Sequence, residues 1–143
     1  MGLSFVIIEN LEIDLYIADK LIKMTMGDNV PIETFMSAET ALDHIVSAKL
    51  KKADRVIILL DLMMPRLNGA DFITLFETLP GRITNHYQIV IVTSSMNKAE
   101  LDRLVKKKHV ETVIAKPLTQ EKLKAVLDQI QINTNGKKAR SGE

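Results

Sequence analysis

Short apolar runs rich in β-branched residues alternate with segments of helical periodicity, and this alternation constrains the fold more than any other feature. The strand-like runs occupy residues 3–8, 32–35, 55–60, 88–92 and 111–115. The segments between and after them carry apolar residues at helical spacing: Ile13, Ile17, Leu21 and Met24; Ala38, Ala41, Leu42 and Ile45; Phe72, Leu75, Phe76 and Leu79; Leu101, Leu104 and Val105; Leu123, Val126, Leu127 and Ile130. Strict alternation of strand and helix predicts an α/β fold, with a parallel sheet covered by helices on both faces.

The polarity of the runs predicts the order of the strands. Residues 5–8, 56–60 and 89–92 are continuously apolar, as strands buried on both sides should be. The runs at 32–35 and 111–115 contain Glu and Thr, which suits the two edges of the sheet. We therefore expect a flavodoxin-like, doubly wound parallel sheet of five strands in the order 2-1-3-4-5, with five helices.

Length and composition favour one domain. Apolar residues make up 46% of the 143 residues and the net charge is +1, so neither disorder nor a nucleic-acid partner is indicated. No apolar run approaches the roughly 18 residues of a membrane span, and the N-terminus does not resemble a signal peptide. The absence of cysteine excludes disulfides and thiolate metal sites. We expect a cytoplasmic protein without a membrane partner.

The chain divides into a domain at residues 1–131 and a tail at 132–143. The tail has no apolar periodicity and several charged residues, so we expect it to be disordered. Asn97, with Glu100, and Thr119 are predicted N-caps of the last two helices, and the peptide bond before Pro117 is expected to be cis.

Polar side chains follow four of the five predicted strands. Glu9 and Asn10 end the first strand, Asp61 the third, Thr93 the fourth and Lys116 the fifth. Ligands of open parallel sheets bind beyond the carboxyl ends of the strands, so we expect these side chains to meet there. The chemistry that fits is phosphoryl transfer to Asp61, which would form an acyl phosphate. Lys116 would bind a phosphoryl oxygen, and the Thr93 hydroxyl would follow the bound group.

A divalent cation would offset the negative charge that a phosphoryl group brings to Asp61. The side-chain oxygens of Glu9, Asn10 and Asp61, completed by the backbone carbonyl of Met63, form a set of hard ligands. Such a set favours Mg²⁺. The sequence therefore predicts a magnesium site that shares Asp61 with the phosphoryl group.

Four motifs in this order resemble those of response-regulator receiver domains, the phosphoacceptor proteins of two-component signalling. The strongest is "DLMMPRLNG" at 61–69, which has the family's spacing of phosphoacceptor Asp, Met-Pro and Gly. "VIIEN" at 6–10 stands at the place of the acidic pair, "IVTSS" at 91–95 at that of the hydroxyl, and "AKP" at 115–117 at that of the lysine. The resemblance extends from about Ser4 to Ile130.

The resemblance implies a stand-alone, chemotaxis-receiver-like domain at 1–131. A histidine kinase or phosphotransfer protein would donate the phosphoryl group. The phosphorylated chain would then act on a downstream protein partner through the surface of its fourth helix, fifth strand and fifth helix. Because the sequence contains no DNA-binding domain, we expect no direct transcriptional role. As a phosphoacceptor, the chain is not expected to be an enzyme.

Two positions depart from the family's pattern. Asn10 stands where a second carboxylate is usual, so one formal charge is missing and a hard cation should bind more weakly. Val113 stands where an aromatic side chain usually rotates inward upon phosphorylation, and a β-branched side chain has few rotamers. If the Thr93 displacement reaches the fourth helix, it must take another route, which we expect to be the loop from Ser94 to Asn97.

These departures keep an alternative open, namely an interaction module of receiver shape that works without phosphorylation. A third hypothesis is a phosphatase-like enzyme with Asp61 as nucleophile. The large aspartyl phosphatase family places a second Asp two residues later, where this chain has Met63. The three histidines lie far apart in the sequence and are expected to be ordinary surface or packing residues. The run 106–108 of three lysines suits the carboxyl end of a helix.

Overall fold

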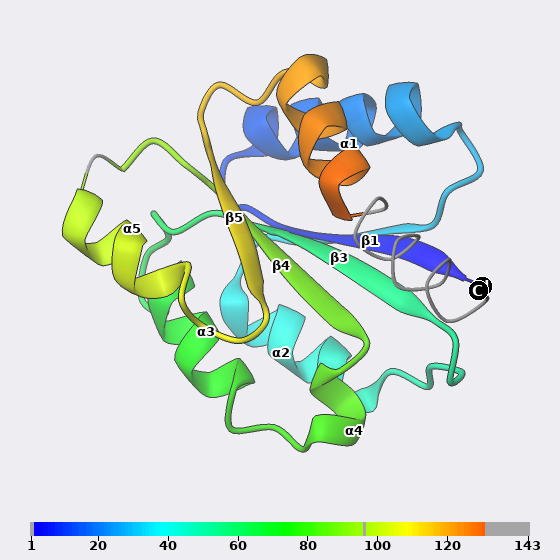
Figure 1. The fold of residues 1–143 in the computed structure, drawn as a ribbon, viewed down its shortest axis with the longest axis vertical. Coiled ribbons are helices and arrows are strands. Elements are labelled where there is room, and N and C mark those ends of the chain that lie inside the picture. Colours follow the sequence, from blue (N-terminus) through cyan, green and yellow to red (C-terminus); the bar gives the residue numbers. More distant parts are fainter. Residues whose placement is uncertain (1, 96, 131–143) are drawn as a thin grey trace, which may run out of the picture.

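The computed structural model describes residues 2–95 and 97–130, and within them five parallel strands form one sheet. The order β2-β1-β3-β4-β5 confirms the predicted one (Figure 1). The strands are β1 (Leu3–Ile8), β2 (Ile32–Phe35), β3 (Arg55–Leu60), β4 (Tyr87–Thr93) and β5 (Val110–Ala115). The predicted tail at 132–143 lies outside the described residues.

Helices cover both faces of the sheet (Figure 1). The labelled helices are α1 (Glu12–Met26), α2 (Ala38–Ser47), α3 (Gly69–Phe76), α4 (Gly81–Thr84) and α5 (Lys98–Leu104), and residues 120–130 are also helical. α1 and the helix at 120–130 lie on one face, and α2, α3 and α5 lie on the other. All five predicted helices are therefore present, and α4 is an additional single turn after Pro80.

The alternation of side chains along each strand divides the core into two layers. In β1, Phe5 and Ile7 pack with α1 and the helix at 120–130, whereas Val6 and Ile8 pack with α2, α3 and α5. All four side chains are buried, with at most 3% of their surface exposed. This burial on both faces is the physical reason why the continuously apolar runs became the central strands.

The apolar stripe predicted on α1 packs on the core only in part, through Leu21. Ala18 and Ile22 are the buried residues of α1, whereas Ile13 and Met24 are 64% and 58% exposed. α1 has apolar residues on two sides, and helical periodicity does not tell which of the two sides faces the sheet. The connection from β1 and the contacts with the sheet determine how the helix is rotated about its axis.

The predicted local features are present. The Asn97 side chain accepts a hydrogen bond from the Glu100 amide at 3.1 Å, and Thr119 Oγ1 accepts one from the Lys122 amide at 3.2 Å. The Lys116–Pro117 peptide bond is cis. None of the helices in residues 2–95 and 97–130 is long and apolar enough to cross a membrane.

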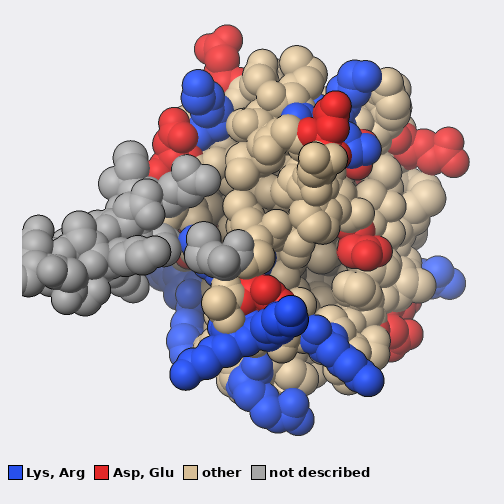
Figure 2. Space-filling view, turned by 90° about the vertical axis from the view of Figure 1, so that its right-hand side faces the viewer, with Lys and Arg blue, Asp and Glu red and all other residues tan. Residues whose placement is uncertain are grey.

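Basic side chains gather on the face at the amino ends of the strands, seen in the lower part of Figure 2. Lys49 and Arg82 line one hollow of the surface, and Arg55 and Lys108 line another. The polar residues that end the strands lie at the opposite edge of the sheet, so this basic face is separate from the candidate site.

Candidate functional site

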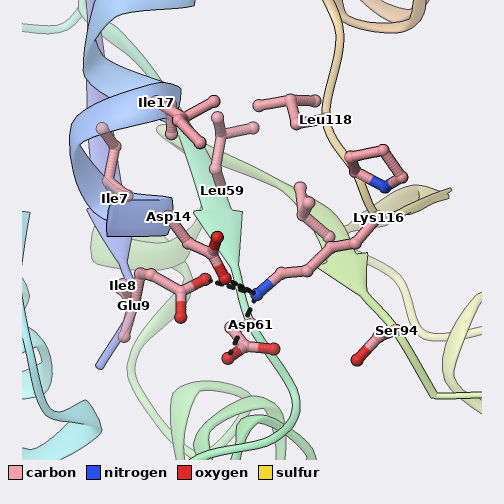
Figure 3. A pocket seen from close by; sticks show the side chains of 13 residues that line it. Ile7, Ile8, Glu9, Asp14, Ile17, Leu59, Asp61, Ser94, Lys116 and Leu118 are labelled. Carbon is pink, nitrogen blue, oxygen red and sulfur yellow. Dashed lines mark hydrogen bonds and ion pairs between the residues drawn. The ribbon is translucent and has the colours of Figure 1, made fainter. Parts of the chain in front are cut away.

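The carboxyl ends of β1, β3 and β5 bring two acids and a lysine into contact, as the sequence predicts (Figure 3). Lys116 Nζ lies 2.9 Å from Glu9 Oε2 and 3.7 Å from Asp61 Oδ2. Glu9 and Asp61 are 5% and 2% exposed, and Lys116 keeps only a small part of its side chain in solvent. In Figure 3 the ammonium lies among the carboxylates, as an ion that balances their charge should.

A third carboxylate, which the sequence analysis did not select, belongs to this cluster. Asp14, in the first turn of α1, places Oδ2 at 2.8 Å from Lys116 Nζ. In sequence, an acid in the first turn of a helix is already explained by the helix dipole. The sequence nonetheless offers a hint of a further role, because Asp14 is a charged residue between the apolar residues Ile13 and Leu15 and follows closely on the first strand.

Burial and charge shift the pKa values of this cluster. Burial, augmented by the nearby charge of Asp61 and opposed by the hydrogen bond from Lys116, raises the pKa of Glu9 to about 7. Burial by itself would lower the pKa of Lys116, but its hydrogen bonds to Asp14 and Glu9 and the charge of Asp61 raise it above its ordinary value. Lys116 is therefore a firmly charged ammonium, and Glu9 is a carboxyl group that still binds a proton near neutral pH.

Asn10 lies in the predicted position beside Glu9. Its Oδ1 atom is buried and has no hydrogen-bond partner among the described residues. Burying an amide oxygen without a partner is costly, and such an atom is a natural place for a cation or water to bind. At the end of β3, the Met63 amide donates to Asp61 Oδ1 at 3.1 Å, while the Met63 side chain is 61% exposed.

Thr93 ends β4 inside the sheet and is 1% exposed. Its backbone carbonyl accepts a hydrogen bond from the Lys116 amide at 2.9 Å, which ties the ends of β4 and β5 together. Its hydroxyl Oγ1 accepts a hydrogen bond from the Ser95 amide at 3.1 Å. The hydroxyl is thus held by the loop that leads to α5.

Gly69 is the first residue of α3, and Asn68 is the N-cap of that helix. In addition, a Cβ atom on Gly69 would lie 2.6 Å from the backbone oxygen of Asp61 and 2.7 Å from Leu62 Cα. Only glycine lets α3 begin this close to the backbone that carries Asp61.

A cavity of about 400 Å³ opens beside the charged cluster (Figure 3). Its polar end is formed by the three carboxylates, Lys116 and Ser94. Its apolar walls come from the sheet, α1 and the loop after β5, through Ile7, Ile17, Ala18, Leu59, Val92 and Leu118. The charged side chains therefore have open space next to them.

Comparisons with known proteins agree with the fold. The family model of the response regulator receiver domain matches residues 6–128. A response regulator receiver protein from Dyadobacter fermentans has a similar structure, with a TM-score of 0.76 and 24% identity over 90% of this chain and 97% of that one. A two-component response regulator from Cytophaga hutchinsonii has a TM-score of 0.74 and 23% identity, over 91% and 97% of the two chains. No curated protein matches the sequence.

Proposed function

The chain belongs to the family of response regulator receiver domains, and on this basis we propose that Asp61 accepts a phosphoryl group from a histidine kinase or phosphotransfer protein. One observation carries the proposal. Asp61 is a buried carboxylate at the end of a central strand, and its nearest cation, Lys116, is shared with a second buried acid. The expected site of action is the cytoplasm.

The proposed reaction forms a bond between an Asp61 carboxylate oxygen and phosphorus. The bond from phosphorus to the donor's imidazole nitrogen breaks, and its electron pair stays on that nitrogen. Lys116, already 3.7 Å from Asp61, can bind a phosphoryl oxygen as a positive charge. The Thr93 hydroxyl can donate to another oxygen once it rotates away from its contact with Ser95.

The residues at the site fit the predicted Mg²⁺. Among the described residues no three His, Cys, Asp or Glu side chains form a metal-binding group. The Asn10 amide, whose buried oxygen lacks a partner among the described residues, is a further ligand of the kind that Mg²⁺ takes. Glu9, Asn10 and Asp61 would hold the ion, with the Met63 carbonyl as a fourth protein ligand. When bound, Mg²⁺ would neutralise part of the charge on Asp61 and the phosphoryl group.

We further propose that phosphorylation acts on α5 through hydrogen bonds of the loop after β4. Thr93 Oγ1 accepts from the Ser95 amide at 3.1 Å, and Ser95 Oγ accepts from the Asn97 amide at 3.3 Å. Asn97 in turn caps α5 through the Glu100 amide. A displacement of Thr93 would pull on this chain of bonds. Val113 packs against the core as a half-buried side chain and cannot provide the usual rotation of a ring.

A downstream protein would recognise the surface of α5, β5 and the helix at 120–130. Thr93 is the last residue before the loop that leads to α5, and Lys116 is the first residue of the loop that leads from β5 to the helix at 120–130. The phosphoryl group adds a charge of about −1.5 to −2 near neutral pH. That charge would favour the arrangement of this surface in which Thr93 and Lys116 contact the phosphoryl oxygens.

The proposal is tested with Mg²⁺ and a small phosphodonor such as acetyl phosphate. Mass spectrometry should show one added phosphoryl group on the wild-type chain and none on Asp61→Asn. Asp128→Asn, an exposed acid on the helix at 120–130, is the matched control and should behave like the wild type. An unmodified wild-type chain would refute phosphoryl transfer and support the alternative, an interaction module that works without phosphorylation.

The route to α5 is tested by amide hydrogen exchange of residues 97–104 with and without beryllium trifluoride as a phosphoryl mimic. The mimic should change exchange in the wild type and have a smaller effect in Ser95→Ala. Ser47→Ala is the matched control, because Ser47 is an exposed serine at the end of α2 and lies outside the site and the chain of hydrogen bonds. Equal responses in the two variants would contradict the proposed route.

A further inference from the structure

Lys116 is bound more closely by Asp14 than by Asp61. Its ammonium lies 2.8 Å from Asp14, 2.9 Å from Glu9 and 3.7 Å from Asp61. Two short hydrogen bonds therefore hold the lysine on the side of α1 and β1 (Figure 3). An ammonium has three donors, and these carboxylates use two of them. A movement of the ammonium toward a phosphoryl oxygen at Asp61 would therefore lengthen at least one of the two short contacts.

The two short contacts differ in how easily they can break. The Glu9 side chain is 6% exposed, so loss of Lys116 would leave a buried carboxylate without its charged partner, which is costly. The Asp14 side chain is 30% exposed and can be hydrated when Lys116 leaves. Asp14 is therefore the contact that Lys116 can give up.

We infer that Asp14 is a positioning residue that holds Lys116 away from Asp61 until a phosphoryl group arrives. The inference rests on the proposed phosphoryl transfer and adds a regulatory residue to it. In the unphosphorylated chain Lys116 is shared by Glu9 and Asp14. When Asp61 is phosphorylated, Lys116 keeps its contact with Glu9, leaves Asp14 and binds a phosphoryl oxygen. Asp14 thereby slows phosphoryl uptake by an amount that reflects the strength of its ion pair.

The test compares rates of phosphoryl uptake from acetyl phosphate with Mg²⁺ in the full chain. Asp14→Asn should accelerate uptake about two- to fivefold, the factor that corresponds to a partly exposed ion pair. Asp19→Asn is the matched control, because Asp19 is also an acid on α1 paired with a lysine, Lys23, at 3.0 Å. It should leave the rate unchanged.

A double-mutant cycle with Lys116→Met separates positioning from simple charge repulsion. If Asp14 acts through Lys116, the substitution Asp14→Asn has no effect in the Lys116→Met background. If Asp14→Asn accelerates uptake equally in both backgrounds, removal of a negative charge explains the effect and the inference is wrong. An unchanged rate for Asp14→Asn in an otherwise wild-type chain that takes up phosphate would also overturn it.

A second measurement does not depend on activity. In ¹⁵N NMR spectra at one constant pH, Asp14→Asn should shift the resonance of the Lys116 ammonium nitrogen, because that nitrogen loses its hydrogen bond to Asp14, and Asp19→Asn should leave it in place. An unshifted Lys116 resonance in Asp14→Asn would overturn the inference even if Lys116→Met failed to fold. Absence of uptake by the wild type, in contrast, would refute the proposed phosphoryl transfer itself, so the two failures can be distinguished.

Discussion

Replacing Gly69 by alanine should damage both the stability of the fold and the geometry of Asp61. The new Cβ would lie 2.6 Å from Asp61 O, 2.7 Å from Leu62 Cα and 2.7 Å from Leu62 Cδ2. Two of these three atoms belong to the backbone and cannot rotate away. Either α3 or the end of β3 must retreat by roughly 0.8 Å to restore an ordinary contact.

The expected cost is about 1–3 kcal/mol, the usual penalty for adding a methyl group to a tightly packed position. The higher helix propensity of alanine recovers at most about 1 kcal/mol. Gly81→Ala is the matched control, since Gly81 is likewise the first residue of a helix. The nearest atom to its added Cβ is Asn85 Nδ2 at 3.6 Å, an ordinary contact. That variant should be neutral or more stable by up to about 1 kcal/mol.

Urea unfolding of the two variants and the wild type provides the measurement. Gly69→Ala should be less stable than Gly81→Ala by at least about 1 kcal/mol, with similar m-values. In the absence of urea, where Gly69→Ala is folded, its rate of phosphoryl uptake should also be lower, because the backbone of Asp61 is displaced. Equal stabilities of the two alanine variants would show that the close approach of α3 to Asp61 does not constrain this position.

Three further predictions concern the charged cluster. In metal-free buffer the free energy of unfolding should fall by at most about 3 kcal/mol as the pH rises from 4.5 to about 7, because the folded chain keeps the Glu9 proton to a higher pH than the unfolded chain. Urea unfolding of Glu9→Gln should show a weaker pH dependence than that of the wild type. The same pH dependence in both proteins would contradict the raised pKa of Glu9. Asn10→Asp adds a carboxylate to the proposed ligands Glu9 and Asp61 and should tighten Mg²⁺ binding about tenfold in calorimetry. Without the metal, the same substitution should lower the stability of the fold. Equal Mg²⁺ affinities of the variant and the wild type would count against Asn10 as a ligand. Met63→Asn replaces an exposed apolar side chain beside Asp61. Because water then reaches the acyl phosphate more easily, dephosphorylation should be several-fold faster. An unchanged rate of phosphate release would show that the Met63 side chain does not hinder hydrolysis.

The strands, their order and the edge that carries the site could be predicted from the sequence. An exposed helix needs polar residues at regular intervals, and the continuous apolar run at 55–60 lacks them. In a sheet, such a run indicates a strand that is buried on both faces. The residues that end each strand are fixed by chain position. Because parallel strands align their carboxyl ends, Glu9, Asp61 and Lys116 had to approach one another once the strand order was known.

The contacts of Asp14 and Gly69, and the buried face of α1, were decided by the tertiary structure. Each depends on how far one element is rotated or shifted against another, and a periodic pattern does not contain that information. Asp14 is an ordinary first-turn acid until α1 is placed over the end of β5, and Gly69 is an ordinary turn residue until α3 begins against Asp61. Local sequence determines which elements form, because periodicity and termini are local properties. Distances across elements result from packing of the whole core, and only the folded chain defines them.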